Sequence, residues 1–249
     1  MTEYPDTRQT RTHARELKFL LDASAACAVR DWARARLTPD PHGLGPHQDE
    51  YSPSTLYFDT DDLDVFHRQR SFGRSKYRVR RYGTSDVIFF ERKMRTNDLL
   101  VKRRTAAGLH ELARLGLIGG DVTWPPNWFH QRLQVRNLTP ICCITYHRMA
   151  RLGMGAYGQI RLTLDDRLTA VATDALAFGG RTATPVAPGM TILELKFRVD
   201  MPAFFKELAE QYALVPQHIS KYRLAVAALG LASLDDAPTV TRAPERQGA

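Results

Sequence analysis

Lys and Arg occupy every second position from Lys76 to Arg80, and Tyr77 and Val79 fill the positions between them. Successive side chains of a β-strand point to opposite faces, so this spacing predicts a strand with one cationic face and one mostly apolar face. Arg side chains grip two phosphate oxygens at once, and Lys acts as a point charge beside them. The chemistry that this face predicts is the binding of a phosphate-bearing anion.

The same alternation recurs in segments that lie far apart in the sequence. Charged residues share one face in three further predicted strands: Glu91, Lys93 and Arg95; Glu16 and Lys18; and Glu194, Lys196 and Arg198. For any one strand, a solvated outer face explains the pattern equally well. Like charges on neighbouring strands destabilise a sheet, however, and a polyanion bound between the strands removes that penalty. The repetition therefore favours an anion-binding face.

Other segments add residues of the same kind. The candidates are Lys102 in the predicted strand 99–105, Tyr146 and Arg148 on one face of the predicted strand 141–148, and Arg161 on a polar face with Thr163 and Asp165. Ser220 is suited to cap a helix over 221–230. Lys221 would then lie beside free backbone N–H groups, and this combination also favours an anion.

Several common site types are excluded. Residues 153–158 match G-x-G-x-x-G, but the residues after them alternate as a strand, whereas a dinucleotide site needs a helix there, so we interpret a hairpin turn. The sequence contains no G-x-x-x-x-G-K-[ST] motif, which argues against an ordinary P-loop NTPase. The histidines show no ligand spacing, and we interpret Cys27, Cys142 and Cys143 as reduced core residues.

The remaining elements must cover the apolar strand faces. Helices are expected after Asp22, a suitable N-cap, and over 61–70, 106–116, 128–137 and 200–212, and further strands over 54–59, 159–165 and 168–172. The apolar strand faces then point outward to the helices, and the charged faces line an interior. The expected fold class is α+β, with a closed antiparallel β-barrel of about eight strands that forms a polar tunnel inside a layer of helices.

Length and composition fit one domain with an anionic partner. The chain has 249 residues, of which 43% are hydrophobic, with a net charge of +8 and a pI near 9.6. It has no apolar run long enough to cross a bilayer, so we expect a cytoplasmic protein without a membrane segment. We expect a disordered N-terminus over 1–12, a single domain over 13–232 and a disordered tail over 233–249.

Seven short motifs, taken in order, are similar to those of a known family. They are Glu16-Leu-Lys18, Thr55-Leu-Tyr-Phe-Asp59, Lys76-Tyr-Arg-Val-Arg80, Phe90-Glu-Arg-Lys93, Arg161-Leu-Thr-Leu-Asp165, Leu193-Glu-Leu-Lys196 and Ser220-Lys-Tyr222. Together they resemble the polyphosphate polymerase domain of the vacuolar transporter chaperone (VTC) family, within the CYTH-like triphosphate tunnel metalloenzymes. The resemblance covers residues 15–231, and the ordered set is far more specific than any single motif.

The resemblance implies roles for individual residues. The phosphate-binding positions would be Lys18, Arg78, Arg80, Lys93, Arg148, Arg161, Lys196 and Lys221, followed by Lys102. We add Lys76, which shares a face with Arg78, and Tyr146, which shares a face with Arg148. Glu194 would be the ligand of a divalent metal, Mn²⁺ or Mg²⁺. Glu16 and Glu91 either assist at this metal or pair with neighbouring cations, and the sequence leaves both roles open.

The resemblance implies a metal-dependent transferase that moves the γ-phosphate of ATP onto a growing polyphosphate chain. Phosphoryl transfer requires positioning and charge neutralisation more than a protein nucleophile, so a tunnel of Lys and Arg with one hard cation is sufficient. Two alternatives stay open: a triphosphatase acting on inorganic or nucleoside triphosphate, and a noncatalytic module that binds polyphosphate or inositol phosphates. The expected partners are ATP and polyphosphate or another short polyanion, but not duplex nucleic acid, which is too wide for such a barrel.

Overall fold

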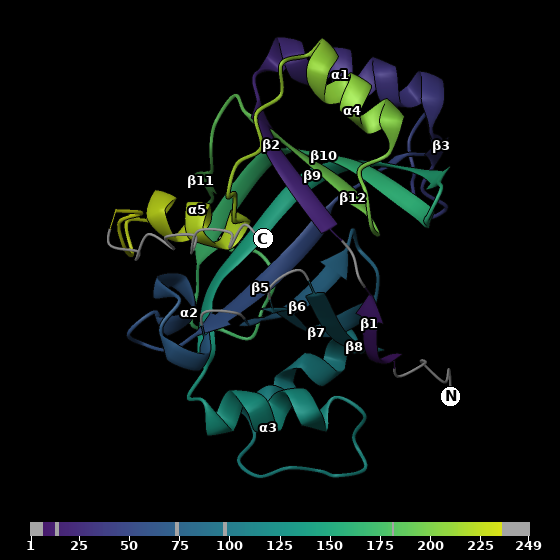
Figure 1. The fold of residues 1–249 in the computed structure, drawn as a ribbon. Coiled ribbons are helices and arrows are strands. Elements are labelled where there is room, and N and C mark those ends of the chain that lie inside the picture. Colours follow the sequence, from purple (N-terminus) through teal and green to yellow (C-terminus); the bar gives the residue numbers. More distant parts are fainter. Residues whose placement is uncertain (1–6, 13–14, 73–74, 97–98, 181, 236–249) are drawn as a thin grey trace, which may run out of the picture.

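The computed structural model describes residues 7–12, 15–72, 75–96, 99–180 and 182–235. One antiparallel sheet dominates the molecule and curves round on itself, with helices packed against its outside (Figure 1). Its main path runs in the order β1-β8-β7-β6-β5-β9-β10-β12-β2. These strands are β1 (Thr7–Thr12), β2 (Arg15–Leu21), β5 (Pro53–Asp59), β6 (Ser75–Tyr82), β7 (Val87–Thr96), β8 (Leu99–Gly108), β9 (Thr139–Gly155), β10 (Gly158–Ala172) and β12 (Thr191–Phe197).

The two ends of this path, β1 and β2, are consecutive in the chain. β1 ends at Thr12 and β2 begins at Arg15, so the Cα atoms of these two residues are at most about 11 Å apart. In the part of the chain that the structure describes, no backbone ladder joins β1 to β2. Side chains do connect β7 with β2, since Lys93 Nζ lies 3.0 Å from Glu16 Oε2. The predicted α+β class and tunnel fold are confirmed. In the described residues the sheet has twelve strands and its backbone ladder is not closed, and an ion pair links β7 to β2.

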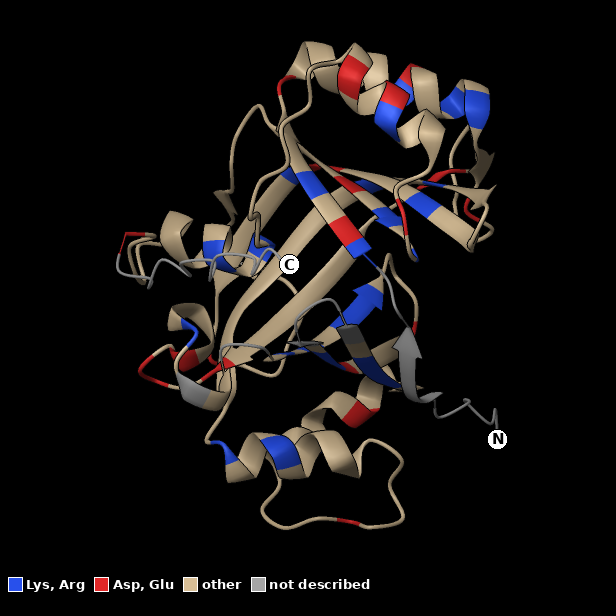
Figure 2. Ribbon diagram, in the orientation of Figure 1, with Lys and Arg blue, Asp and Glu red and all other residues tan. Residues whose placement is uncertain are grey.

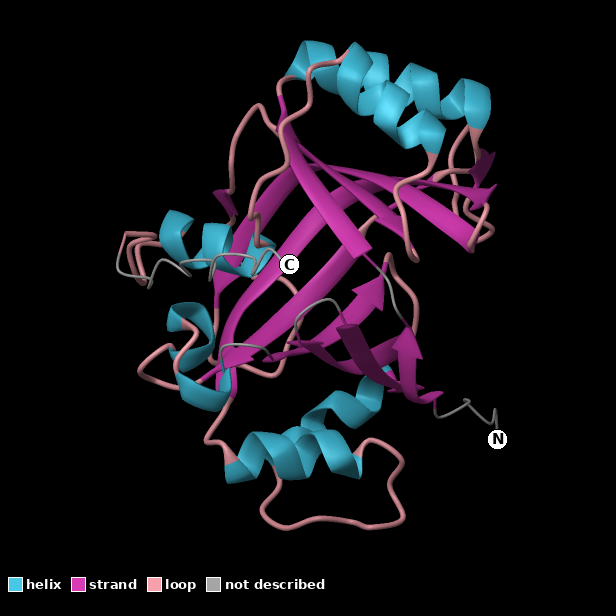
Figure 3. Ribbon diagram, viewed as in Figure 1, coloured by secondary structure: helices cyan, strands magenta, loops and turns pink. Residues whose placement is uncertain are grey.

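Helices cover opposite sides of the sheet (Figure 3). The remaining elements are α1 (Ala23–Arg36), α2 (Asp64–His67), α3 (Asn127–Val135), α4 (Ala203–Gln211), α5 (Lys221–Ala228), the 3₁₀ helices η1 (Arg70–Phe72) and η2 (Leu109–Gly116), and the short strands β3 (Thr38–Pro39), β4 (Glu50–Tyr51) and β11 (Thr184–Pro185). α1 and α4 pack on β2, β10 and β12. η2, α2, α3 and α5 pack on the other half of the sheet.

The apolar strand faces point outward into two cores, as the alternation predicts. Leu193 and Leu195 of β12 are fully buried beside Phe205 of α4 in one core. Phe90 of β7 packs edge to face against Phe129 of α3 in the other. Because these faces are taken by the helices, the charged faces of the same strands are left to line the interior.

Two of the predicted helices are shorter than the sequence suggests. The helix expected over 61–70 is reduced to the single turn of α2, flanked by Leu63 and Arg68 in the left-handed conformation. Ala106 and Ala107 were expected in a helix over 106–116, but they continue β8 and pair with Phe89 and Ile88 of β7. Pairing along the sheet overrides the helix propensity of alanine at these positions.

Three further expectations need correction. The predicted strand 168–172 is the second half of β10, set off by an irregular register between Asp166 and Thr169. The strand predicted over 191–199 ends at Phe197, so Arg198 is exposed and does not share the charged face. The predicted disorder over 1–12 does not hold for Thr7–Thr12, which form β1 and pair with β8. The expectations for 1–6 and 236–249 fall outside the described residues.

The cysteines are only partly as expected. Cys142 and Cys143 are buried in β9, and burial raises the pKa of the Cys142 thiol to about 12. Cys27 is exposed on α1, so its assignment to the core is wrong. Within the described part of the chain, no helix is both long and apolar enough to span a membrane.

Candidate functional site

Charged residues occur on strands of both halves of the sheet (Figure 2). Alternation along each strand places them opposite the apolar faces that pack on the helices, and therefore on the inner faces. The predicted site residues fall into adjoining groups on these faces, each arranged around a carboxylate or a hydroxyl group. Because neighbouring groups perturb one another's pKa values, they form one continuous charged lining. We call this lining the tunnel face.

Glu16 and Glu194 form the first group with three lysines. Glu16 accepts from Lys18 at 3.1 Å and from Lys93 at 3.0 Å, and Lys196 Nζ lies 3.3 Å from Glu194 Oε1. The two carboxyl groups also interact directly with each other. Burial alone would raise the pKa of Glu194, but Lys196 and Lys18 hold it well below its usual value. Glu194 is therefore an ionised carboxylate at neutral pH.

Glu91 is the centre of the second group. This fully buried carboxylate lies 2.8 Å from Arg78, 2.8 Å from Lys102 and 3.2 Å from Arg104. Although burial opposes ionisation, these cations keep the pKa of Glu91 well below its usual value. All of its close partners come from the basic strands β6 and β8. The geometry favours an ion-pairing role for Glu91 over the alternative role at a metal.

Asp165 of β10 organises the third group. Its buried carboxylate pairs with the guanidinium of Arg148, with Nη2 to Oδ2 at 2.7 Å, and lies 2.6 Å from Lys221 Nζ. Burial acts against the charge, but Arg148 and Lys221 bring the pKa of Asp165 down to about 2. The ring of Tyr146 lies beneath both cations, at 5.3 Å from Arg148 and 5.2 Å from Lys221. Lys221 is the first residue of α5, so this ion pair places the start of the helix at the tunnel face.

Arg161 of β10 and Arg80 of β6 have other partners on the tunnel face. Arg161 Nη2 is 2.6 Å from Asp40 Oδ2 and also donates to the phenol oxygen of Tyr51. Arg80 donates to Thr55 Oγ1 at 3.1 Å, and its guanidinium lies 6.0 Å from the ring of Tyr82. Neither guanidinium is part of the three carboxylate groups above.

Lys76 differs from the other lysines of the tunnel face. Its ammonium donates to Ser220 Oγ at 2.6 Å, and the described residues offer it no carboxylate within ion-pair distance. Burial lowers its pKa well below the usual value, and the neighbouring cations Lys18, Lys93 and Arg78 lower it further. Neighbouring cations favour the neutral form of this half-buried lysine, and an anion would relieve the repulsion and favour its protonated form, so this position is suited to an anion.

The structure thus brings together every site residue predicted from the sequence and adds several that the prediction missed. Arg104 was detectable, because it alternates with Lys102 and so must share its face. Tyr57 alternates with Thr55 in the same way, and its phenol oxygen accepts from Arg78 at 3.4 Å. Asp40 and Tyr51, by contrast, come from the long segment before β5 and carry no local signal of their position.

Glu16 and Glu194 are the residues best suited to a divalent metal. In the described part of the chain, no three Asp, Glu, His or Cys side chains gather as a metal-binding group. Hard cations such as Mg²⁺ need fewer protein ligands than that, because they commonly use one or two carboxylates together with substrate phosphates. Two adjacent ionised carboxylates therefore fit such an ion, although three lysines occupy the same oxygens in this structure.

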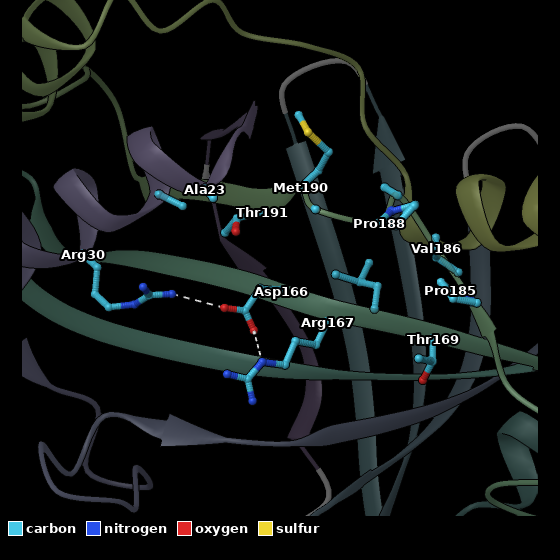
Figure 4. Close-up of a pocket in the computed structure, with 14 residues that line it drawn as sticks. Ala23, Arg30, Asp166, Arg167, Thr169, Pro185, Val186, Pro188, Met190 and Thr191 are labelled. Carbon is cyan, nitrogen blue, oxygen red and sulfur yellow. Dashed lines mark hydrogen bonds and ion pairs between the residues drawn. The ribbon is translucent and has the colours of Figure 1, made fainter.

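A separate pocket of about 350 Å³ lies on the outer surface, between α1 and the segment 185–191 (Figure 4). Asp166 is central to it and pairs with Arg30 at 3.1 Å and with His147 at 3.0 Å. His147 neighbours Arg148 in β9 but points to the opposite face, so the pocket does not belong to the tunnel face.

Comparison with solved structures supports the assignment of the fold. The chain superposes on a candidate adenylate cyclase from Bacillus halodurans with a TM-score of 0.51 and 15% identity, covering 86% of this chain and 97% of that one. A candidate adenylyl cyclase from Hippeastrum, described as having a dominant triphosphatase activity, gives a TM-score of 0.46 and 13% identity. This superposition covers 89% of this chain and 96% of that one. A search of the curated proteins gave no match.

The sequence matches the family model described as the VTC domain over residues 13–230. That span contains every residue of the tunnel face named above. The chain therefore belongs to the VTC domain family and has the triphosphate tunnel fold.

Proposed function

We propose that this protein is a metal-dependent polyphosphate polymerase, which transfers the γ-phosphate of ATP to a growing polyphosphate chain along the tunnel face. The observation that carries the proposal is the environment of Lys76, a half-buried lysine on the tunnel face whose charged neighbours are cations. The lining as a whole also has more Lys and Arg than carboxylates. A linear polyanion would neutralise this excess along several strands at once.

The carboxylates of the tunnel face favour a phosphate acceptor over water. Hydrolysis commonly uses a general base, and a good base has a pKa near the working pH. Asp165, with a pKa of about 2, and Glu91 and Glu194, whose pKa values are depressed, are weak bases that are already held by cations. The terminal phosphate of a polyphosphate chain is itself an anionic nucleophile. It requires cations to bring it into line, and the tunnel face supplies them.

Glu194, with Glu16 beside it, would hold the divalent metal, Mn²⁺ or Mg²⁺. When bound, such an ion neutralises charge on the phosphate oxygens and helps to orient them. The lysines that pair with these carboxylates would then be available to bind phosphate. Lys18, Lys93 and Lys196 would thus exchange their carboxylate partners for substrate oxygens, which keeps each charge paired.

The test is the fate of the label in γ-labelled ATP, incubated with purified protein and Mn²⁺ or Mg²⁺. We expect label in chains that lengthen with time, resolved on a gel stained for polyphosphate. Release of label only as free phosphate, at every metal and ATP concentration, would overturn the polymerase and indicate a triphosphatase. Binding of polyphosphate without any turnover would instead indicate a noncatalytic module.

A further inference from the structure

The charged lining continues past Ser220, beyond the residues assigned to the tunnel face. Ser220 Oγ accepts from Lys76 Nζ at 2.6 Å and from the backbone N–H of Arg223 at 3.3 Å. Arg223 is on the first turn of α5, and its guanidinium lies 5.3 Å from the ring of Phe66 in α2. Ser220 therefore connects Lys76 of the tunnel face with the backbone of Arg223, whose guanidinium lies between α5 and α2.

Arg68 adds a second cation at this junction. It follows α2 directly, and α2 and α5 lie side by side at one edge of the molecule (Figure 1). The charge of Arg68 acts on both Lys76 and Arg223. Its backbone is left-handed, with φ of 58°, a conformation that non-glycine residues adopt at a cost. The fold thus holds Arg68 near two like charges in a strained conformation.

These cations lack the carboxylate partners found elsewhere in the protein. Among the described residues, no ion pair joins Arg68 or Arg223 to an Asp or Glu, although Asp61 and Asp62 lie just before α2. The guanidinium of Arg223 donates once to the carbonyl of Leu234, at 3.3 Å, and its Nε is buried without a hydrogen-bond partner. An unsatisfied buried donor beside a like charge indicates a place for an anionic acceptor.

We propose that Arg68 and Arg223 form a phosphate subsite at the α5 end of the tunnel, which holds the part of a polyphosphate chain that extends beyond the tunnel face. Lys76 would pass the chain to this subsite, and Ser220 separates the two. The subsite rests on the proposed function in that its ligand is the same polymer. The proposal assigns triphosphate to the tunnel face alone and only longer chains to both arginines, so the subsite should give a preference for long chains.

The experiment compares Arg68→Gln/Arg223→Gln with the unchanged protein. The ligands are inorganic triphosphate and a long polyphosphate of defined length, with dissociation constants measured calorimetrically at several salt concentrations. For the long chain we expect an affinity loss of roughly five- to tenfold and a salt slope reduced by about 2, since each arginine contributes about 1. For triphosphate we expect no change. Arg132→Gln, which removes an exposed cation from α3, is the control and should change neither affinity.

Two outcomes of the double variant would overturn the subsite. One is an equal loss for triphosphate and the long chain, which would place the arginines in the tunnel site or indicate a damaged fold. The other is an unchanged affinity for both ligands. Arg68→Lys keeps the charge and should retain long-chain binding, so a loss in this variant also contradicts the proposal. Polymerase activity is not the readout, so a protein that makes no chains but shows the expected loss would support the subsite and contradict only the proposed function.

Discussion

The phenol of Tyr222 donates a hydrogen bond to the carboxylate of Asp59, and both side chains are buried. Asp59 ends β5, and it also accepts from the backbone N–H groups of Val65 and Phe66 in α2. One carboxylate thus joins β5, α2 and α5. This contact explains why the motifs at 55–59 and 220–222 occur together, because it holds in place the helix start that carries Lys221 to the tunnel face.

Tyr222→Phe removes this hydrogen bond and leaves the ring in place. We expect the free energy of unfolding to fall by about 1–3 kcal/mol, because a buried charged acceptor loses one of its donors. Chemical denaturation measures the change. Tyr157→Phe is the matched control, since Tyr157 is exposed in the β9–β10 turn and its hydroxyl should contribute little. Equal stability of the two variants would contradict the proposed role of Asp59, which is to hold β5, α2 and α5 together by hydrogen bonds.

Glu194→Gln should abolish metal-dependent turnover and leave the fold intact, because it removes charge from the tunnel face and creates no cavity. The adjacent Leu195→Ala changes the opposite, fully buried face and should lower the free energy of unfolding by about 2–5 kcal/mol. Turnover at saturating metal and thermal unfolding distinguish the two effects. Full activity in Glu194→Gln would indicate that Glu16, and not Glu194, is the main metal ligand.

Polyanion affinity should fall as the pH rises through about 8. Burial lowers the pKa of Lys93 and of Lys102 to about 8, so both lose their charge above that pH in the free protein. An anion favours the protonated form, and binding near pH 8 should therefore take up protons from the buffer. Calorimetry in buffers of different ionisation enthalpy measures this uptake. Lys93→Arg keeps its charge at all these pH values and should flatten the dependence.

Asp165 should contribute to stability at neutral pH and lose that contribution in acid. Its folded pKa of about 2 lies below the usual value, so its contribution is complete above about pH 4 and disappears as the pH falls through 2. The expected size is about 2 kcal/mol. Unfolding by denaturant at several pH values measures it. Asp165→Asn should be less stable at pH 7, with Arg148 and Lys221 left unneutralised, and should show a weaker loss between pH 4 and 2.

The sequence by itself determined which residues share a face. Alternation along a strand has a period of two, so the charged set from Lys76 to Arg80 and the buried set Tyr77 and Val79 were separable without any tertiary information. Amphipathic helices must pack on an apolar surface, so the apolar strand faces were expected to point outward to the helices and the charged faces inward. The N-caps at Asp22 and Ser220 were also predictable, because each depends on a side chain within three residues of the N–H that it accepts.

Only the tertiary structure decided which charges meet. Lys93 and Glu16 are far apart in sequence and lie on different parts of the sheet, so their contact depends on how the sheet curves. The register of the neighbouring strands β6, β7 and β8 brings Glu91 to Arg78 and Lys102. Among the described residues, Lys76 has Ser220 as its hydrogen-bond partner and no carboxylate. Arg68 and Arg223 showed no strand alternation, because they belong to a turn and a helix. Their proximity follows from the packing of α2 against α5, which no local pattern in the sequence records.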